Sequence, residues 1–252
     1  LPISPMYYVA LMTFILIFSS VTMVLAVDAG HHMNKSKVTF YMLLTIIGGA
    51  VFVGSQAWEW KNFIKGEYGA LETKGGQILQ FVNSDTGKRV AIADFAVSIP
   101  TERSTHKLSN GIWYENEGSL PTYSLVEVLE GFESNNNLVI RTEKLDENGH
   151  KIVLTRDDSL DKIYNAIGVV EGANLVHNEY GNRLFADFFF FITGFHGFHV
   201  FSGVIINIII FFNVIVGTYE KRGHYEMVEK VGLYWHFVDL VWVFVFTFFY
   251  LV

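Results

Sequence analysis

The sequence of 252 residues contains no cysteine. This absence excludes disulfide bonds, thiolate metal sites, iron–sulfur clusters and cysteine nucleophiles. The sequence also lacks a phosphate-binding glycine loop, a dinucleotide-binding glycine fingerprint, an HExxH motif and a GxSxG motif. The usual signatures of soluble enzymes are therefore missing, and we predict no catalytic residue in the chain.

Basic residues are few as well. Lys and Arg together number 18, against 25 Asp and Glu, for a formal net charge of -7. Residues 66–180 hold 18 of the acidic and 10 of the basic residues, so the rest of the chain is nearly neutral. Binding to a phosphate backbone requires a basic surface, and no segment offers one. We therefore expect no nucleic acid among the partners.

Long apolar runs dominate what is present. Hydrophobic residues make up 51% of the chain and aromatic residues 16%. A helix needs about 20 mostly apolar residues to cross the hydrocarbon core of a bilayer. Four stretches reach this length, at about residues 6–27, 38–60, 184–216 and 231–252. The sequence therefore predicts an all-α transmembrane helix bundle with four spanning helices.

The polar segment between the second and third runs has a different pattern. Residues 66–180 alternate apolar and polar side chains between turn motifs, which is typical of β-strands. We therefore expect three parts. Residues 1–65 form transmembrane helices 1 and 2, residues 66–180 an extracytoplasmic β-rich insertion, and residues 181–252 transmembrane helices 3 and 4.

Two turn motifs in the insertion predict β-hairpins. Asn148-Gly149 separates the strand-like runs Leu138–Thr142 and Lys151–Thr155, and Asn-Gly favours the positive φ angles of a hairpin turn. The second motif is Asp85-Thr86-Gly87, between Ile78–Val82 and Val90–Ile92.

The distribution of basic residues predicts the orientation of the chain. The two short links, residues 28–37 and 217–230, together carry five basic residues, whereas three basic residues lie near the opposite helix ends. The positive-inside rule then places the short links in the cytoplasm and residues 66–180 outside. The absence of cysteine and the long insertion favour a bacterial plasma (inner) membrane, with the insertion on its periplasmic side.

Five ionisable residues within or near the predicted spans are the candidate site residues, because such residues are costly in a membrane. Glu59 lies between two tryptophans near the end of the second span. His196 and His199 are three residues apart on one face of the third span, and His236 and Asp239 share a face of the fourth. The histidines could ligate a metal or haem, or form hydrogen bonds across helix interfaces, and the spacing leaves both interpretations open.

Several motifs resemble the cytochrome c oxidase subunit III family. Residues 191–200 (FITGFHGFHV), followed by Gly203, resemble the family's helix 6 signature, and residues 234–242 (YWHFVDLVW) resemble its last-helix signature. Residues 56–60 (QAWEW) resemble the end of the helix two before the last, and Glu179-Tyr180-Gly181 followed by Phe185 resembles the lead-in to helix 6. The resemblance covers about residues 1–66 and 179–252 and corresponds to the last four helices of a family whose members have seven or five.

The resemblance implies an accessory, non-catalytic subunit of a proton-pumping cytochrome c oxidase in aerobic respiration. Such a subunit holds no redox centre: haem and copper reside in subunits I and II, its expected partners. The family binds phospholipid and supports proton uptake and the stability of the catalytic subunit. We therefore expect Glu59, His196, His199, His236 and Asp239 to make interhelical polar contacts or to contact lipid headgroups, with no metal or cofactor in this chain.

Other functions remain open at this stage. The chain could be the equivalent subunit of a quinol oxidase or of a nitric oxide reductase complex, because these share much of the pattern. It could instead be a membrane receptor or transporter with an outer ligand-binding domain. The acidic insertion could also attract a basic cytochrome c or dock another respiratory complex.

Overall fold

The computed structural model describes residues 5–97, 105–109, 114–118 and 121–250. Within these ranges the chain forms two compact units. The helical unit comprises residues Leu1–Glu59 and Phe189–Val252, and the sheet unit comprises residues Trp60–Phe188.

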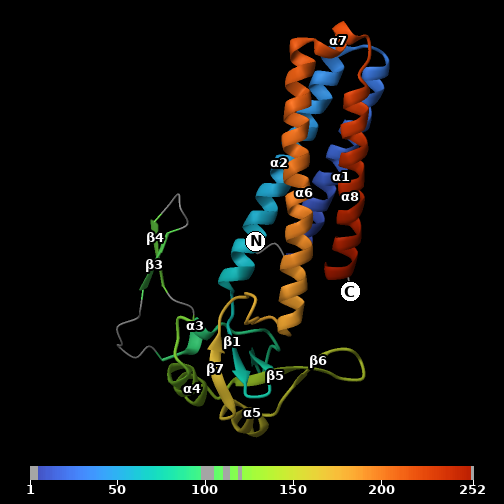
Figure 1. The fold of residues 1–252 in the computed structure, drawn as a ribbon. Helices are drawn as coiled ribbons and strands as arrows, with labels where there is room; N and C mark the ends of the chain where they lie inside the picture. The colour runs from blue at the N-terminus through green and yellow to red at the C-terminus, as the bar shows by residue number, and fades with distance from the viewer. Residues whose placement is uncertain (1–4, 98–104, 110–113, 119–120, 251–252) are drawn as a thin grey trace. The chain divides into compact units, whose positions relative to one another are not determined.

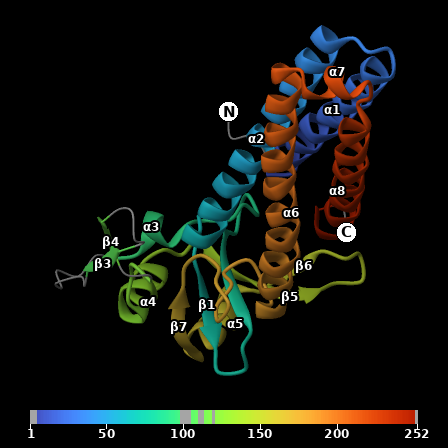
Figure 2. The same cartoon turned by 45° about the horizontal axis from the view of Figure 1, so that its top comes forward.

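Four long helices run side by side in the helical unit (Figure 1). They are α1 (Pro5–His31), α2 (Lys35–Lys65), α6 (Arg183–Val216) and α8 (Glu226–Tyr250). The last turns of α2 and the first turns of α6 belong to the sheet unit. The short helix α7 (Thr218–Arg222) links α6 to α8 at one end of the bundle, as Figure 2 also shows. All four long helices have the length and composition of membrane spans. The predicted helix bundle is thus confirmed, although α2 and α8 begin several residues earlier than the apolar runs suggested.

Small residues allow the helices to pack closely. A Cβ on Gly48 would lie 2.6 Å from the Ser19 Cβ of α1, and a Cβ on Gly203 would lie 3.0 Å from the Trp235 ring of α8. The outward surface is apolar instead: on α6, Phe191 is 71% exposed and Phe198 66% exposed. Buried hydroxyl groups and exposed phenylalanines are the distribution expected of a bundle that faces lipid.

A five-stranded antiparallel sheet forms the centre of the sheet unit, with strand order β6-β5-β2-β1-β7. Its strands are β1 (Ala70–Thr73), β2 (Ile78–Asn83), β5 (Leu138–Leu145), β6 (Lys151–Val153) and β7 (Ala166–Val170). Strands β3 (Thr105–Ser109) and β4 (Tyr114–Gly118) form a second, two-stranded sheet. The predicted β-rich insertion is confirmed.

One face of the sheet packs on short helices that the strand pattern did not reveal. These helices are α3 (Ile92–Phe95), α4 (Leu125–Glu133) and α5 (Arg156–Ile163). Leu79, Phe81 and Ile140 of the sheet are fully buried against Val128 and Phe132 of α4. Burial of a side chain of this size contributes about 1.5–3 kcal/mol, so this interface forms the apolar core of the unit.

The two predicted hairpins have different outcomes. β5 pairs with β6 around Asn148-Gly149, where Gly149 has a φ of 79°, so this hairpin is confirmed. The second forms only in part: Arg89 bridges Val82, but the expected strand at Val90–Ile92 is wrong. The chain turns into α3 there because the Ile92 N–H donates to the Tyr68 carbonyl instead of extending a ladder.

Candidate functional site

The Glu59 carboxylate lies near the end of α2 and joins it to the end of α8. The Gln56 side-chain amide donates to Glu59 Oε2 at 2.8 Å, and the Tyr250 hydroxyl donates to Glu59 Oε1 at 2.8 Å. The Glu59 side chain is half-buried. The two hydrogen bonds use both carboxylate oxygens, so Glu59 fixes the ends of α2 and α8 to each other.

His196 is a buried member of the α6–α8 interface, 3% exposed. Its Nε2 donates to the Val238 carbonyl of α8 at 3.1 Å. The ring packs against Phe52 of α2 and Trp242 of α8, with ring centroids 5.8 and 5.0 Å away. Its Nδ1 is buried and has no hydrogen-bond partner among the described residues.

His199 faces a different environment although it lies one turn away. Its Nδ1 donates to the Phe195 carbonyl of the preceding turn at 2.8 Å, and the ring is half-buried between Phe195 and Phe198. Both histidines line an apolar groove of about 170 Å³ with Phe191, Ile192, Phe195, Phe237, Val238, Val241 and Val245. The groove offers two imidazoles to an apolar ligand, but no anionic side chain.

His236 and Asp239 of α8 meet α1 at Ser20. The Ser20 hydroxyl shares a short hydrogen bond with His236 Nδ1, and it also interacts with the Asp239 carboxylate. Asp239 Oδ1 is buried without a further partner in the described residues. Ser20 therefore connects His236 and Asp239 to α1. The two α6 histidines have other hydrogen-bond partners.

The five predicted site residues thus lie in three separate groups: Glu59, the α6 histidines, and the α8 pair with Ser20. Within the described residues, no three His, Asp or Glu side chains are placed to hold a metal ion. The arrangement shown for these groups is chiefly one of hydrogen bonds between or along helices.

Sequence reasoning missed two tryptophans that join α8 to α1. Trp235 Nε1 donates to the Ser19 hydroxyl at 3.1 Å, and Trp242 Nε1 donates to the Thr13 hydroxyl at 2.9 Å. Both indoles are buried, and a buried indole N–H needs a partner. Small hydroxyl residues in an apolar run were the available signal, but their partners lie more than 200 residues away in the sequence.

The sequence analysis named Glu179 only within the lead-in motif and gave it no role, although it is a buried hydrogen-bonding centre of the sheet unit. Its carboxylate is fully buried and accepts four backbone N–H groups: Glu67 and Tyr68 at Oε1, and Gly69 and Gly172 at Oε2, at 2.7–3.2 Å. Three of these donors lie two to four residues after the end of α2, and Gly172 lies two residues after the end of β7. Glu179 therefore holds the chain leaving α2 beside the chain approaching α6.

Glycines make this arrangement possible. Gly66 and Gly172 have φ angles of 76° and 73°, which L-residues with a Cβ rarely adopt. A Cβ on Gly66 would overlap the Glu179 carboxylate, and a Cβ on Gly172 would overlap the Ile64 carbonyl. Both glycines are required by close approach as well as by backbone angle.

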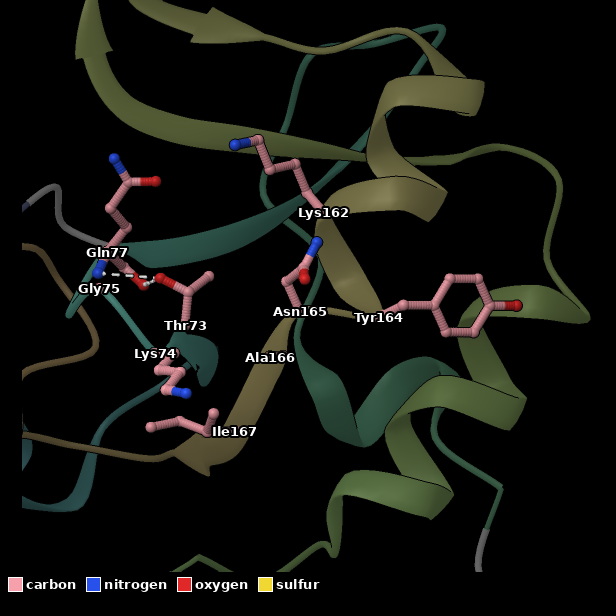
Figure 3. A pocket seen from close by; sticks show the side chains of 9 residues that line it. All are labelled: Thr73, Lys74, Gly75, Gln77, Lys162, Tyr164, Asn165, Ala166 and Ile167. Carbon is pink, nitrogen blue, oxygen red and sulfur yellow. Dashed lines mark hydrogen bonds between the residues drawn. The ribbon is translucent and has the colours of Figure 1, made fainter.

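A wide pocket of about 570 Å³ lies elsewhere in the sheet unit, between the β1–β2 turn and the α5–β7 connection (Figure 3). Lys74 and Lys162 point away from each other across it, and the Tyr164 ring is directed out of it. The Tyr164 hydroxyl donates to Glu133, and the Thr73 hydroxyl bonds the Gln77 backbone. The polar groups do not converge, so the pocket does not define a ligand.

The structure defines a multi-pass helical membrane protein with an inserted β-sheet unit. The family described as cytochrome c oxidase subunit III matches residues 163–252, which contain α6 and α8 with four of the five candidate residues. This part of the chain is similar to that family. The resemblance of residues 1–66 to the family stays a prediction.

Individual relatives show the same similarity. A protein of Rickettsia conorii named probable cytochrome c oxidase subunit 3 is 44% identical over 75 residues. Proteins named cytochrome c oxidase subunit 3 from Thermostichus vulcanus and Synechocystis are 37% identical over 79 residues and 41% identical over 78. These matches cover 29%, 29% and 30% of the present chain. They span only 26%, 37% and 33% of the relatives' lengths.

Proposed function

We propose that the chain is the subunit III component of a proton-pumping, oxygen-reducing cytochrome c oxidase. The observation that carries the proposal is the family match over α6 and α8, the helices that bear both histidine-containing signatures. In this assignment the chain transfers no electrons. Haem and copper belong to subunits I and II, against which the bundle packs.

In this proposal the candidate residues have two roles: some link helices, and others contact lipid. Glu59, His236 and Asp239 link helices by hydrogen bonds. His196 and His199 line the apolar groove, which has the chemistry to hold an acyl chain beside two imidazoles that could contact a headgroup. Through these contacts the bundle would stabilise the catalytic subunit and support its proton uptake.

The basic short links suggest how the chain is oriented. With Lys35, Lys37 and Lys221 among the cytoplasmic residues, the insertion at residues 66–180 faces the outside of a bacterial plasma membrane. There it could meet cytochrome c or another respiratory complex, as its acidic composition would favour.

Histidine substitutions test whether the chain itself holds haem. We expect His196→Gln and His199→Gln to leave the haem content of the tag-purified complex unchanged, because neither imidazole is assigned to iron. Haem per mole of protein is measured from the visible spectrum after extraction. His224→Gln, an exposed loop position, is the matched control. A stoichiometric loss of haem in both α6 variants, but not in the control, would reverse the assignment.

A further inference from the structure

Three basic side chains of the sheet unit converge around Tyr180. Lys151 Nζ donates to the Tyr180 carbonyl at 3.4 Å, and the Arg89 guanidinium lies 5.9 Å from the Tyr180 ring centroid. Arg141 reaches the same place through Gln80: its guanidinium donates twice to Gln80 Oε1, and Gln80 Nε2 donates to the Tyr180 carbonyl. Residues 89, 141 and 151 come from three different segments.

The cluster holds three basic groups, whereas two carboxylates, Glu143 and Glu179, act on it. Burial, together with repulsion from Arg141 and Arg89, lowers the pKa of the Lys151 ammonium, and Glu143 offsets these effects less. Burial also lowers the pKa of Arg89, an effect that the Glu179 carboxylate opposes, and Arg89 Nε is buried without a partner among the described residues. The basic cluster is set in a segment with 18 acidic and 10 basic residues. A local excess of half-buried cations with an unused donor is the electrostatic environment of an anion site.

The cluster lies where two membrane-spanning helices end. Tyr180 stacks on Phe63 of the last turns of α2, with ring centroids 4.8 Å apart, and α6 begins three residues after Tyr180. Lys65 and Arg183, both exposed, flank the same helix ends. Aromatic and basic residues at helix ends are typical of the headgroup region of a bilayer.

We propose that Arg89, Arg141 and Lys151 bind the phosphate of an anionic phospholipid headgroup in the leaflet next to the sheet unit. Arginine and lysine donate strong charge-assisted hydrogen bonds to phosphate oxygens. A lipid is favoured over a free phosphate because the cluster adjoins the last turn of α2 and the start of α6, and helix ends with aromatic and basic residues are typical of the headgroup region. The site belongs to the inserted segment and does not depend on the proposed oxidase role.

The test uses the full chain in vesicles of phosphatidylcholine that contain either spin-labelled phosphatidylglycerol or spin-labelled phosphatidylcholine. Electron paramagnetic resonance gives the motionally restricted fraction of each label, and hence the preference for the anionic lipid. We expect Lys151→Gln to weaken binding of phosphatidylglycerol at the cluster about fivefold and thereby lower the overall preference, and Lys151→Arg to retain it. Lys144→Gln, an exposed neighbour on β5, removes the same charge and should change nothing.

Two results would overturn the proposal. One is an equal preference for phosphatidylglycerol in the wild-type protein and Lys151→Gln, with both proteins folded by circular dichroism. The other is displacement of the restricted phosphatidylglycerol by millimolar inorganic phosphate, which would indicate a site for free anions. The lipids around the helical unit are common to all variants, so the difference between variants reports the site in the sheet unit.

Discussion

Replacing Glu179 with alanine is expected to lower the free energy of unfolding of the sheet unit by about 3–5 kcal/mol. The substitution leaves four backbone N–H groups without their acceptor in a site where Glu179 is fully buried. Each buried donor that loses its partner costs about 1–3 kcal/mol, and local relaxation recovers part of the total. The Glu179→Gln variant keeps the side-chain shape and one acceptor oxygen. Its free energy of unfolding should therefore fall less than that of Glu179→Ala.

Hydrogen exchange on the full chain measures this effect directly. The amides of Glu67, Tyr68, Gly69 and Gly172 should lose protection in Glu179→Ala, while those of β5 change less. Glu130→Gln removes an exposed carboxylate of α4 and is the matched control. Unchanged protection of the four amides would mean that Glu179 does not hold the two chain segments together.

Introducing leucine at Gly49 is expected to destabilise the helical unit by at least about 2 kcal/mol. A Cβ at this position would lie 2.5 Å from Trp235 Cη2 on α8 and 2.8 Å from Val204 Cγ2 on α6. The side chain therefore cannot be placed unless α2 moves away from both helices. A looser bundle should lose its folded population in detergent at a lower temperature.

Gly54 provides a control on the same helix. A Cβ there meets nothing within 4 Å, so Gly54→Leu changes the same residue type without touching a neighbouring helix. Thermal unfolding of both variants in one detergent, followed by size-exclusion chromatography, compares them. Equal melting temperatures for the two leucine variants would contradict the close packing of α2 on α6 and α8.

The parts of the fold that depend on local sequence could be predicted. Four apolar runs of membrane length predict four helices, because a single segment in lipid can form all its backbone hydrogen bonds internally only as a helix. Asn148-Gly149 predicts a hairpin because the turn needs a positive φ. The start of α4 also had a local signal: Ser124 and Glu127 form a capping box, a pattern that the strand alternation concealed.

The parts that depend on distant residues could not be predicted. One backbone donor to Glu179, Gly172, lies seven residues earlier, and the other three lie more than 100 residues earlier. The same is true of Ser20 with His236, and of Ser19 with Trp235. Spacing within one helix identified polar faces on α6 and α8, but it did not reveal that His196 and His236 point to different neighbours.

Affinity purification through a tag on this chain, in a mild detergent, tests the proposed function most directly. The proposal predicts that a haem- and copper-containing subunit I co-purifies, visible in the absorption spectrum and identified by mass spectrometry. A subunit II with copper ligands would indicate cytochrome c as electron donor, and its absence a quinol oxidase. A haem-free protein without any oxidase subunit would contradict the proposal.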